Sequence, residues 1–298
     1  MDISLDVGRL RLLTEVAMRG SIAAAAREVG LTSSAVSQQL AILEREAGTP
    51  LLDRSPRGVL LTGAGQALVG RARVILGLLE EARADLDRLS GELAGEVRLG
   101  TVASAAASLV SEAATRLLAE HTELELSVTV AEPADSISQL TAGDLDVAVV
   151  DVYDGVPVPF PDYLTATELI TEPLVVVAAP GTLPAGQRTL AELADRDWVM
   201  PPLTAACGQA VRFACRAEGF EPRVRWETDD MLLLVRAVAA GHGIAVLPRL
   251  AVADNVAEVE LRPLHEPRMQ RRLIALTRTS SQARPVVRAV LAELAKAC

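Results

Sequence analysis

The segment from Ser21 to Thr62 constrains the fold of this chain more than any other. Ser21 can cap a short, alanine-rich helix over Ile22 to Val29, because its hydroxyl can accept a backbone N–H left open at the helix start. Gly30 can end that helix at low cost, since glycine readily adopts the left-handed conformation. Thr32 can then cap a second helix. The segment therefore predicts two helices joined by a tight turn.

The second helix of this pair carries different side chains on its two faces. Its apolar face holds Val36, Leu40, Leu43 and Ala47. The opposite face is small and polar, and it holds Ser34, Ser37, Gln38, Ala41 and Arg45. Two helices of which the second exposes short hydrogen-bonding side chains are typical of a helix-turn-helix, whose second helix enters the major groove of DNA.

A predicted hairpin follows in residues 51–62, LLDRSPRGVLLT, as strand, Pro-Arg-Gly turn and strand. It would form the wing of a winged helix-turn-helix. Gln can pair with adenine through two hydrogen bonds, Ser accepts several base edges, and Arg can bind phosphate or enter a narrow minor groove. The candidate DNA-binding residues are therefore Ser33, Ser34, Ser37, Gln38, Arg54 and Arg57. Each of them taken alone can equally be a solvated surface residue.

Residues 31–65, LTSSAVSQQLAILEREAGTPLLDRSPRGVLLTGAG, resemble the signature of LysR-type transcriptional regulators. The resemblance rests on Ser37, Gln39, Leu43, Glu44, Gly48, Leu51, Arg54, Thr62 and Gly65. Leu13 and Leu52 stand where the family usually has Phe. Both differences keep an apolar side chain in the small domain, so we expect them to affect packing rather than DNA contact.

A long helix is predicted over Gly63 to Ser90. Its apolar residues follow one another in steps of four and three over three heptads, as in a coiled-coil seam, and they are Leu68, Ala72, Ile75, Leu79, Ala82, Leu86 and Leu89. The alternative is an amphipathic helix that packs on the protein's own core. The resemblance favours the seam, because LysR-type regulators dimerise through a linker helix here and usually assemble as dimers of dimers.

From Glu96 onward, short apolar strands alternate with helices. Strands are predicted at 97–100, 124–130, 145–150 and 173–178, and further strands and helices follow to residue 296. Such alternation predicts a mainly parallel sheet with helices on both faces. The series occurs twice, with two crossings near residues 163–171 and 259–267. Two such lobes resemble periplasmic binding proteins, the shape of the effector domain in LysR-type regulators.

The predicted fold class is thus α/β overall, with three parts. A winged helix-turn-helix covers residues 5–62, a dimerising linker helix residues 63–90, and a two-lobed effector domain residues 91–298. Lobe I would cover about 91–163 and 268–298, and lobe II about 164–267.

An effector site is expected where strands of the two lobes end, because α/β proteins bind ligands there and helix N-termini add anion sites. Four segments qualify: 101–104, 132–136, 202–207 and 228–230. Hydroxyls that could donate to a small carboxylate or a neutral ligand are Thr101, Ser104, Thr204 and Thr228. Each hydroxyl can equally serve as a plain helix cap.

The net charge of −10 is placed unevenly along the chain. The first 90 residues carry eleven acidic and eleven basic side chains, whereas the remainder carries 28 and 18. Neutralisation of phosphate is a main source of affinity for DNA. We therefore expect the neutral N-terminal domain to need two copies and well-placed Arg, and to bind DNA in a salt-sensitive way.

Two cysteines, Cys207 and Cys215, resemble in location the pair of peroxide-sensing LysR-type members, although that pair is one residue farther apart. Eight residues of helix rise about 12 Å, too far for a disulfide without unwinding. Both can instead be ordinary buried cysteines.

Other classes of function find little support in the sequence. Three scattered His and three Cys give no metal-ligand spacing, so we expect no metal and no cofactor. GxSxG and P-loop motifs are absent, which argues against an enzyme, although a two-lobed catalytic module remains an alternative. No run of about eighteen apolar residues occurs, so we expect a cytoplasmic protein without a membrane span.

The sequence thus predicts a LysR-type regulator that binds a dyad-symmetric operator in double-stranded DNA as a homodimer or homotetramer, and senses a small molecule between its lobes. An architectural DNA binder whose C-terminal half only oligomerises is the alternative that a ligand response would exclude.

Overall fold

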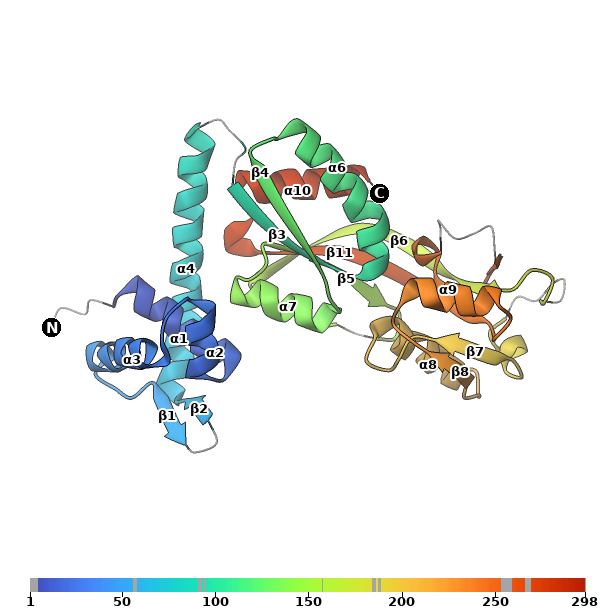
Figure 1. The fold of residues 1–298 in the computed structure, drawn as a ribbon, viewed down its shortest axis with the longest axis horizontal. Helices are drawn as coiled ribbons and strands as arrows, with labels where there is room; N and C mark the ends of the chain where they lie inside the picture. The colour runs from blue at the N-terminus through green and yellow to red at the C-terminus, as the bar shows by residue number, and fades with distance from the viewer. Residues whose placement is uncertain are drawn as a thin grey trace. The chain divides into compact units, whose positions relative to one another are not determined.

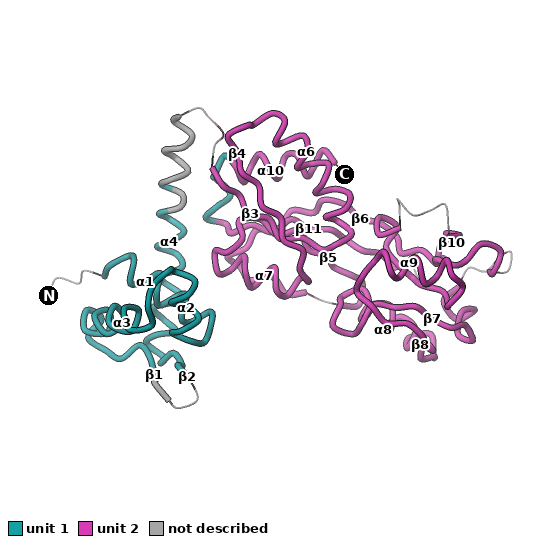
Figure 2. Tube along the Cα trace, in the orientation of Figure 1, with its two compact units in different colours: residues 1–92, 280–285 teal, residues 93–279, 286–298 magenta. Residues whose placement is uncertain are grey.

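The computed structural model describes residues 5–55, 58–90, 93, 95–156, 158–183, 186, 189–252, 259–265 and 269–297 (Figure 1). Of residues 54, 55, 58, 80, 81 and 83–90 only the backbone is described. The chain divides into two compact units, shown in Figure 2. Unit 1 comprises residues 1–92 and 280–285, and unit 2 comprises residues 93–279 and 286–298.

Three helices form the N-terminal part of unit 1, and each begins at a side-chain cap. They are α1 (Val7–Arg19), α2 (Ile22–Glu28) and α3 (Ser33–Ala47). The side chains of Asp6, Ser21 and Thr32 accept hydrogen bonds from the backbone N–H groups three residues further on. The caps predicted at Ser21 and Thr32 are confirmed.

The apolar faces of these helices form one core with the hairpin and the start of α4 (Gly63–Ser90). Val36, Leu40 and Leu43 of α3 are almost fully buried in it. Leu13 and Leu52, which replace the Phe usual in LysR-type regulators, are buried in the same core. The two differences therefore concern packing, as expected.

The hairpin of unit 1 pairs β1 (Leu52–Ser55) with β2 (Gly58–Leu61) in antiparallel register, which confirms the strands of the predicted wing. Residues 56–57, for which the turn was predicted, lie outside the described residues. A carboxylate fixes the start of the hairpin: Oε1 of Glu44 accepts hydrogen bonds from the N–H groups of Leu51 (2.9 Å) and Leu52 (3.1 Å). The helix predicted over 63–90 is confirmed as α4.

In unit 2 the first sheet is mixed. Its strands are β3 (Gly95–Thr101), β4 (Leu124–Val130), β5 (Val147–Tyr153), β6 (Leu164–Ala178) and β11 (Gln270–Arg278), in the order β6-β11-β5-β3-β4. β3 pairs in parallel with β4 and β5, whereas β11 pairs in antiparallel with β5 and β6. The described helices of this lobe are α5 (Ala103–Ala105), the π-helical η1 (Ala106–Val110), α6 (Ser111–Glu120), α7 (Pro133–Ala142) and α10 (Pro285–Lys296).

The second lobe of unit 2 is built on the far end of β6. There β6 pairs in antiparallel with β9 (Ala245–Pro248) and β10 (Glu260–Pro263), while β7 (Asp197–Met200) pairs in parallel with β8 (Arg223–Glu227). Helices α8 (Ala206–Ala217) and α9 (Met231–Ala239) pack on these strands around the buried Trp198. Short 3-10 turns of this lobe lie at η2 (Ala191–Leu193) and η3 (Arg249–Ala251), whereas η5 (Thr279–Ser281) directly follows β11.

The expectation of a mainly parallel sheet was wrong for the strands that join the lobes. The first crossing, expected near residues 163–171, is part of the 15-residue strand β6, which runs beside β11 from one lobe to the other (Figure 1). β11 lies between β5 and β6 and runs opposite to both, so β5 and β6 share one direction. The antiparallel pairs arise because β11 follows the second lobe in the chain and returns to the first sheet between these two strands.

Among the described residues, no helix combines the length and the apolar character needed to span a membrane.

Candidate functional site

The predicted recognition face of α3 is bare in unit 1. Ser33, Ser34 and Gln38 are exposed and Ser37 is half-buried. The hydroxyls of Ser34 and Thr32 lie 3.1 Å apart, so part of this face is already ordered at the helix start. Short hydroxyl and amide side chains held on an exposed helix can reach the edges of bases.

Two contacts hold α3 against α1 and fix the direction of that face. The guanidinium of Arg9 donates from Nη2 to Oε1 of Glu46 (2.6 Å) and from Nε to Oε2 (3.1 Å). Nη1 of Arg9 also donates to Oε1 of Gln39 (3.4 Å). A two-bond pair between Arg and carboxylate sets orientation as well as distance. The exposed face is therefore presented by a clamped helix.

The two arginines predicted on the wing are described less completely than the residues of α3. Arg54 lies on β1 opposite Val59, with only its backbone described. Arg57 lies outside the described residues. Contacts of these two arginines with DNA therefore stay predictions.

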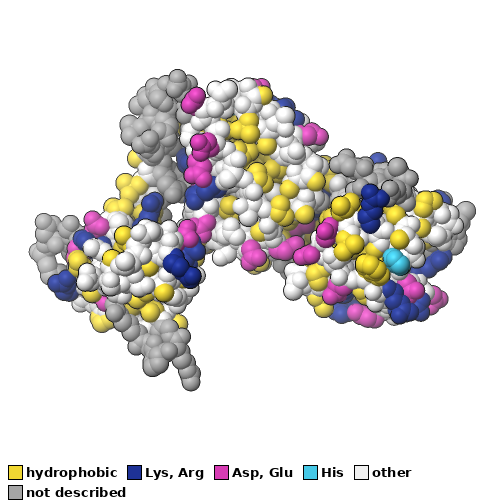
Figure 3. All heavy atoms as spheres, in the orientation of Figure 1, with side chains coloured by type: hydrophobic (Ala, Val, Ile, Leu, Met, Phe, Trp, Pro, Cys, Tyr) yellow, Lys and Arg dark blue, Asp and Glu magenta, His cyan; other side chains and the backbone are white. Residues whose placement is uncertain are grey.

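Helix α4 divides its apolar residues between two roles. Val69 and Ala72 are buried in the core of unit 1, whereas Val74, Ile75, Leu78 and Leu79 are exposed. Apolar side chains lie on the surface of α4 in Figure 3 (yellow). Leu68 and Ala72 of the predicted seam thus pack on the protein's own core, as the alternative expected. Ile75 and Leu79 of that seam are exposed beside Val74 and Leu78, so a coiled-coil contact there stays a prediction. The side chains of Leu86 and Leu89 lie outside the described residues.

A cleft in unit 2 brings together the four segments that the sequence singled out. Its lining includes Ser104 from the first segment, Glu132 from the second, Ala205 and Cys207 from the third, and Asp229 from the fourth. Asp151, Tyr153 and Arg271 from the strands complete the polar part of its wall. The cleft holds about 40 Å³ of open space, which corresponds to a few water molecules.

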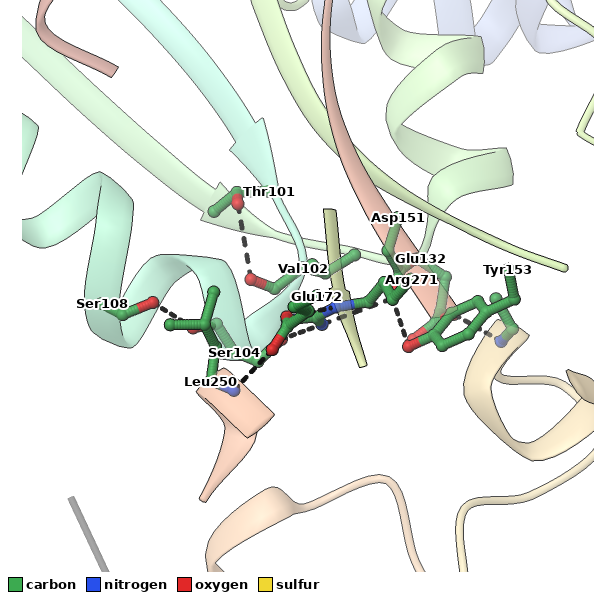
Figure 4. A network of polar contacts seen from close by, with 11 residues as sticks. Thr101, Val102, Ser104, Ser108, Glu132, Asp151, Tyr153, Glu172, Leu250 and Arg271 are labelled. Carbon is green, nitrogen blue, oxygen red and sulfur yellow. Dashed lines mark hydrogen bonds and ion pairs between the residues drawn. The ribbon is translucent and has the colours of Figure 1, made fainter. Parts of the chain in front are cut away.

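Arg271 is the centre of the polar network at this cleft (Figure 4). It is 1% exposed, and its Nε donates to Oε1 of Glu172 at 2.8 Å, with Nη2 bonded to the same oxygen. Nη1 of Arg271 donates to Oγ of Ser104 (2.6 Å). Oε2 of Glu172 accepts from the N–H of Leu250 (2.8 Å). The network therefore links a helix of the first lobe, both crossing strands and a turn of the second lobe.

Asp151 has one satisfied and one unsatisfied oxygen. Its Oδ2 accepts from the hydroxyl of Tyr153 (2.8 Å) and lies 3.8 Å from Nη1 of Arg271. Its Oδ1 is buried and has no hydrogen-bond partner among the described residues. Burial raises the pKa of Asp151, since the charged form loses its hydration. A polar group left open in this way is unusual in a folded protein.

Glu132 adds a second carboxylate to the wall. Its Oε2 accepts from the N–H of Ala206 at the start of α8 (3.2 Å). Burial raises the pKa of Glu132, and the nearby carboxylates of Asp151 and Asp229 raise it further. These carboxylates therefore act on one another inside the same cleft.

The hydroxyls predicted to bind an effector are placed unevenly. Ser104 lines the cleft, but it is engaged by Arg271. Thr101 is fully buried and does not belong to the lining. Thr204 is exposed outside the lining, and the hydroxyl of Thr228 accepts from the N–H of Asp230 (3.2 Å), as a local cap does. Each of the four segments contributes residues to the lining, and effector binding there stays a prediction. The carboxylates in these segments were not considered in the sequence, because only donors were sought.

Cys207 and Cys215 both lie in α8 as free, buried thiols. Burial raises the pKa of each thiol to about 12. Because the thiolate is the reactive form, neither has the character of a redox sensor. The structure favours the alternative of ordinary buried cysteines. Among the described residues, no group of His, Cys, Asp and Glu could hold a metal ion.

Comparison with known proteins decides the family. Residues 7–66 match the model of the bacterial regulatory helix-turn-helix protein, lysR family, and residues 90–298 match the model of the LysR substrate binding domain. The chain belongs to the LysR family. Members of this LysR family are DNA-binding transcriptional regulators rather than enzymes, and they combine a helix-turn-helix with an effector-binding domain.

Individual relatives match over nearly the whole chain. The LysR-family chain is 30% identical over 292 residues to the HTH-type transcriptional regulator CbbR of Rhodospirillum rubrum, covering 96% of this chain and 94% of that one. Full-length OxyR from Pseudomonas aeruginosa has a similar fold, with a TM-score of 0.72 at 21% identity over 98% and 95% of the two chains. CbnR in complex with its target DNA aligns with a TM-score of 0.56 at 21% identity over 98% and 99%.

Proposed function

We propose that this regulator reads a dyad-symmetric operator with the exposed face of α3, and that a small molecule in the cleft of unit 2 alters its binding. The observation that carries the proposal is the bare polar face of α3, held by Arg9 and Glu46 while the opposite face is buried. Ser33, Ser34, Ser37 and Gln38 would reach base edges, and Arg54 and Arg57 would bind phosphate or the minor groove.

Two copies are needed for such an operator, because a two-fold dimer places two recognition helices in successive major grooves. The exposed stripe of Val74, Ile75, Leu78 and Leu79 on α4 supports a helix-to-helix contact between copies. We propose a homodimer through the linker helix at 63–90, which can pair further into a homotetramer. The domain borders are accordingly proposed at 5–62, 63–90 and 91–298.

The effector would act on the arrangement of the two lobes. Ligand in the cleft touches groups from both lobes, so it stabilises the arrangement in which those groups meet. The linker helices would carry the change to the DNA-binding domains of the dimer. Because the operator is chromosomal DNA, we place this activity in the cytoplasm.

Replacing Gln38 with alanine tests the DNA-binding face. The change should weaken binding to the operator by about 1–3 kcal/mol and relax base preference at one position, since Gln pairs with one base edge. Binding is measured by fluorescence anisotropy at fixed salt, with DNA from the region that flanks the protein's own gene. Gln209→Ala, an exposed glutamine of unit 2, is the matched control and should bind as the wild type does. Equal affinity and equal base preference in all three proteins would remove Gln38 from the interface.

A further inference from the structure

The positive charge at the cleft is already neutralised. Arg271 is the one Lys or Arg among the described residues that line the cleft. Two of its nitrogens bind Oε1 of Glu172, and a third binds Oγ of Ser104. Glu172 itself is 5% exposed, so this pair is buried and neutral, and Nη1 of Arg271 also lies 3.8 Å from Oδ2 of Asp151. Arg271 therefore has little left to offer an anionic ligand.

The remaining charges in the wall are all negative. Asp151 stands on β5, Glu132 precedes α7 and Asp229 precedes α9, and all three line the cleft. They come from three separate elements that the fold brings to one place. In a cleft with limited water, such charges interact more strongly than on an open surface. A carboxylate ligand would bring a fourth negative charge into this field.

One atom marks where a ligand would bind. Oδ1 of Asp151 is buried and has no hydrogen-bond partner among the described residues, and Asp151 is one of the residues that line the cleft. The other oxygen is occupied by the hydroxyl of Tyr153. A buried acceptor without a partner costs free energy that a donor from a ligand would recover. An ammonium group supplies both the donor and the compensating charge.

We propose that the cleft binds the ammonium head of a small amine, with Oδ1 of Asp151 as the main acceptor and Glu132 and Asp229 beside it. The proposal rests on the proposed function, because it names the chemical class of effector for the same cleft. The open space of about 40 Å³ suits an ammonium head with one or two carbons, and a longer stem would extend toward solvent. This proposal replaces the small carboxylate or neutral effector, which was expected from the hydroxyls alone, with a cation.

Three probes of matched size and different charge test the class. Intact protein is titrated with butylammonium, butyrate and butan-1-ol at neutral pH, where the amine is protonated and the acid ionised. Thermal shift and calorimetry report binding. Saturable stabilisation by butylammonium alone is the expected result. Stabilisation by butyrate or butan-1-ol in its place, or by none of the three, overturns the amine proposal.

Two variants locate the site. Asp151→Asn should weaken butylammonium binding about tenfold or more, through the loss of one charge-assisted hydrogen bond. Asp154→Asn, an exposed acid just after β5 and outside the lining, should bind as the wild type does. Because burial disfavours the charged form of Asp151, the Asn variant should melt no lower than the wild type. Unchanged butylammonium binding in Asp151→Asn would place the site elsewhere.

The two proposals fail in different ways. Operator binding by the wild type and its weakening in Gln38→Ala require no ligand, so they test the DNA-binding function alone. Failure of butylammonium to bind would leave that result intact and remove only the amine.

Discussion

Replacing Glu172 with alanine should lower the free energy of unfolding of unit 2 by about 3–5 kcal/mol, because the buried guanidinium of Arg271 loses its hydrogen-bonded carboxylate and keeps only Asp151, 3.8 Å from Nη1. Arg271 is 1% exposed and loses the acceptor of its Nε and Nη2. The N–H of Leu250 loses its acceptor as well. Both groups lose their hydrogen-bond acceptor on β6, next to β11, where these two strands run from one lobe to the other.

Tryptophan fluorescence in a urea titration measures this effect selectively. The chain has two Trp, Trp198 and Trp226, and both lie in unit 2. Glu168→Ala, an exposed acid on the same strand, is the matched control and should change stability by about 0.5 kcal/mol or less. The double variant Glu172→Leu with Arg271→Met should recover much of the loss, since it removes the unpaired charge. A Glu172→Ala protein as stable as the control would show that the network does not hold the lobes.

Gly65→Ala should destabilise unit 1 by about 1–3 kcal/mol or more, because the added methyl group has no room. A Cβ at this position would lie 2.1 Å from the carbonyl oxygen of Leu51, and backbone cannot give way as a flexible side chain can. Gly70 lies on the same helix, and a Cβ there meets no atom within 4 Å. Gly70→Ala should therefore stabilise α4 by up to about 1 kcal/mol through helix propensity.

The two substitutions should therefore change the stability of unit 1 in opposite directions. Helix loss followed by far-UV circular dichroism reports unit 1 together with unit 2, and the Trp signal reports unit 2 alone. Gly65→Ala should shift an early part of the dichroism transition and leave the Trp transition in place. Equal stability of the two alanine variants would contradict the contact with Leu51.

Local signals made unit 1 predictable from sequence. Each of these signals acts within a few residues: capping at Ser21 and Thr32, the apolar spacing of α3, and the strand-turn-strand pattern. A short stretch of sequence is therefore enough to determine each of these elements. The apolar stripe on α4 was predictable for the same reason. Its first turns pack on their own domain, because Leu68 and Ala72 of the expected seam lie in the core of unit 1 together with Val69.

The cleft was less predictable, because its network joins positions far apart in the chain. Arg271 and Glu172 are paired across β11 and β6, and 99 positions separate them. The sequence of neither strand predicts that these two residues pair. A charged residue directly before an apolar run, as in TEPLVVV and QRRLIAL, does however indicate a charge that is buried. Strand ends identified the four segments, but the buried state of Asp151 depends on how the two lobes close around it.

We propose that the face of α3 carrying Ser34 is bare in the free protein and lies against base edges on the operator. Ser34→Cys, with Cys298→Ser to remove the C-terminal thiol, tests it through the rate of maleimide modification. Cys207 and Cys215 contribute little background, since burial raises the pKa of both thiols to about 12. We expect rapid modification in the free protein and strong protection by operator DNA. Equal rates with and without the operator, or a thiol that is unreactive in the free protein, would contradict it.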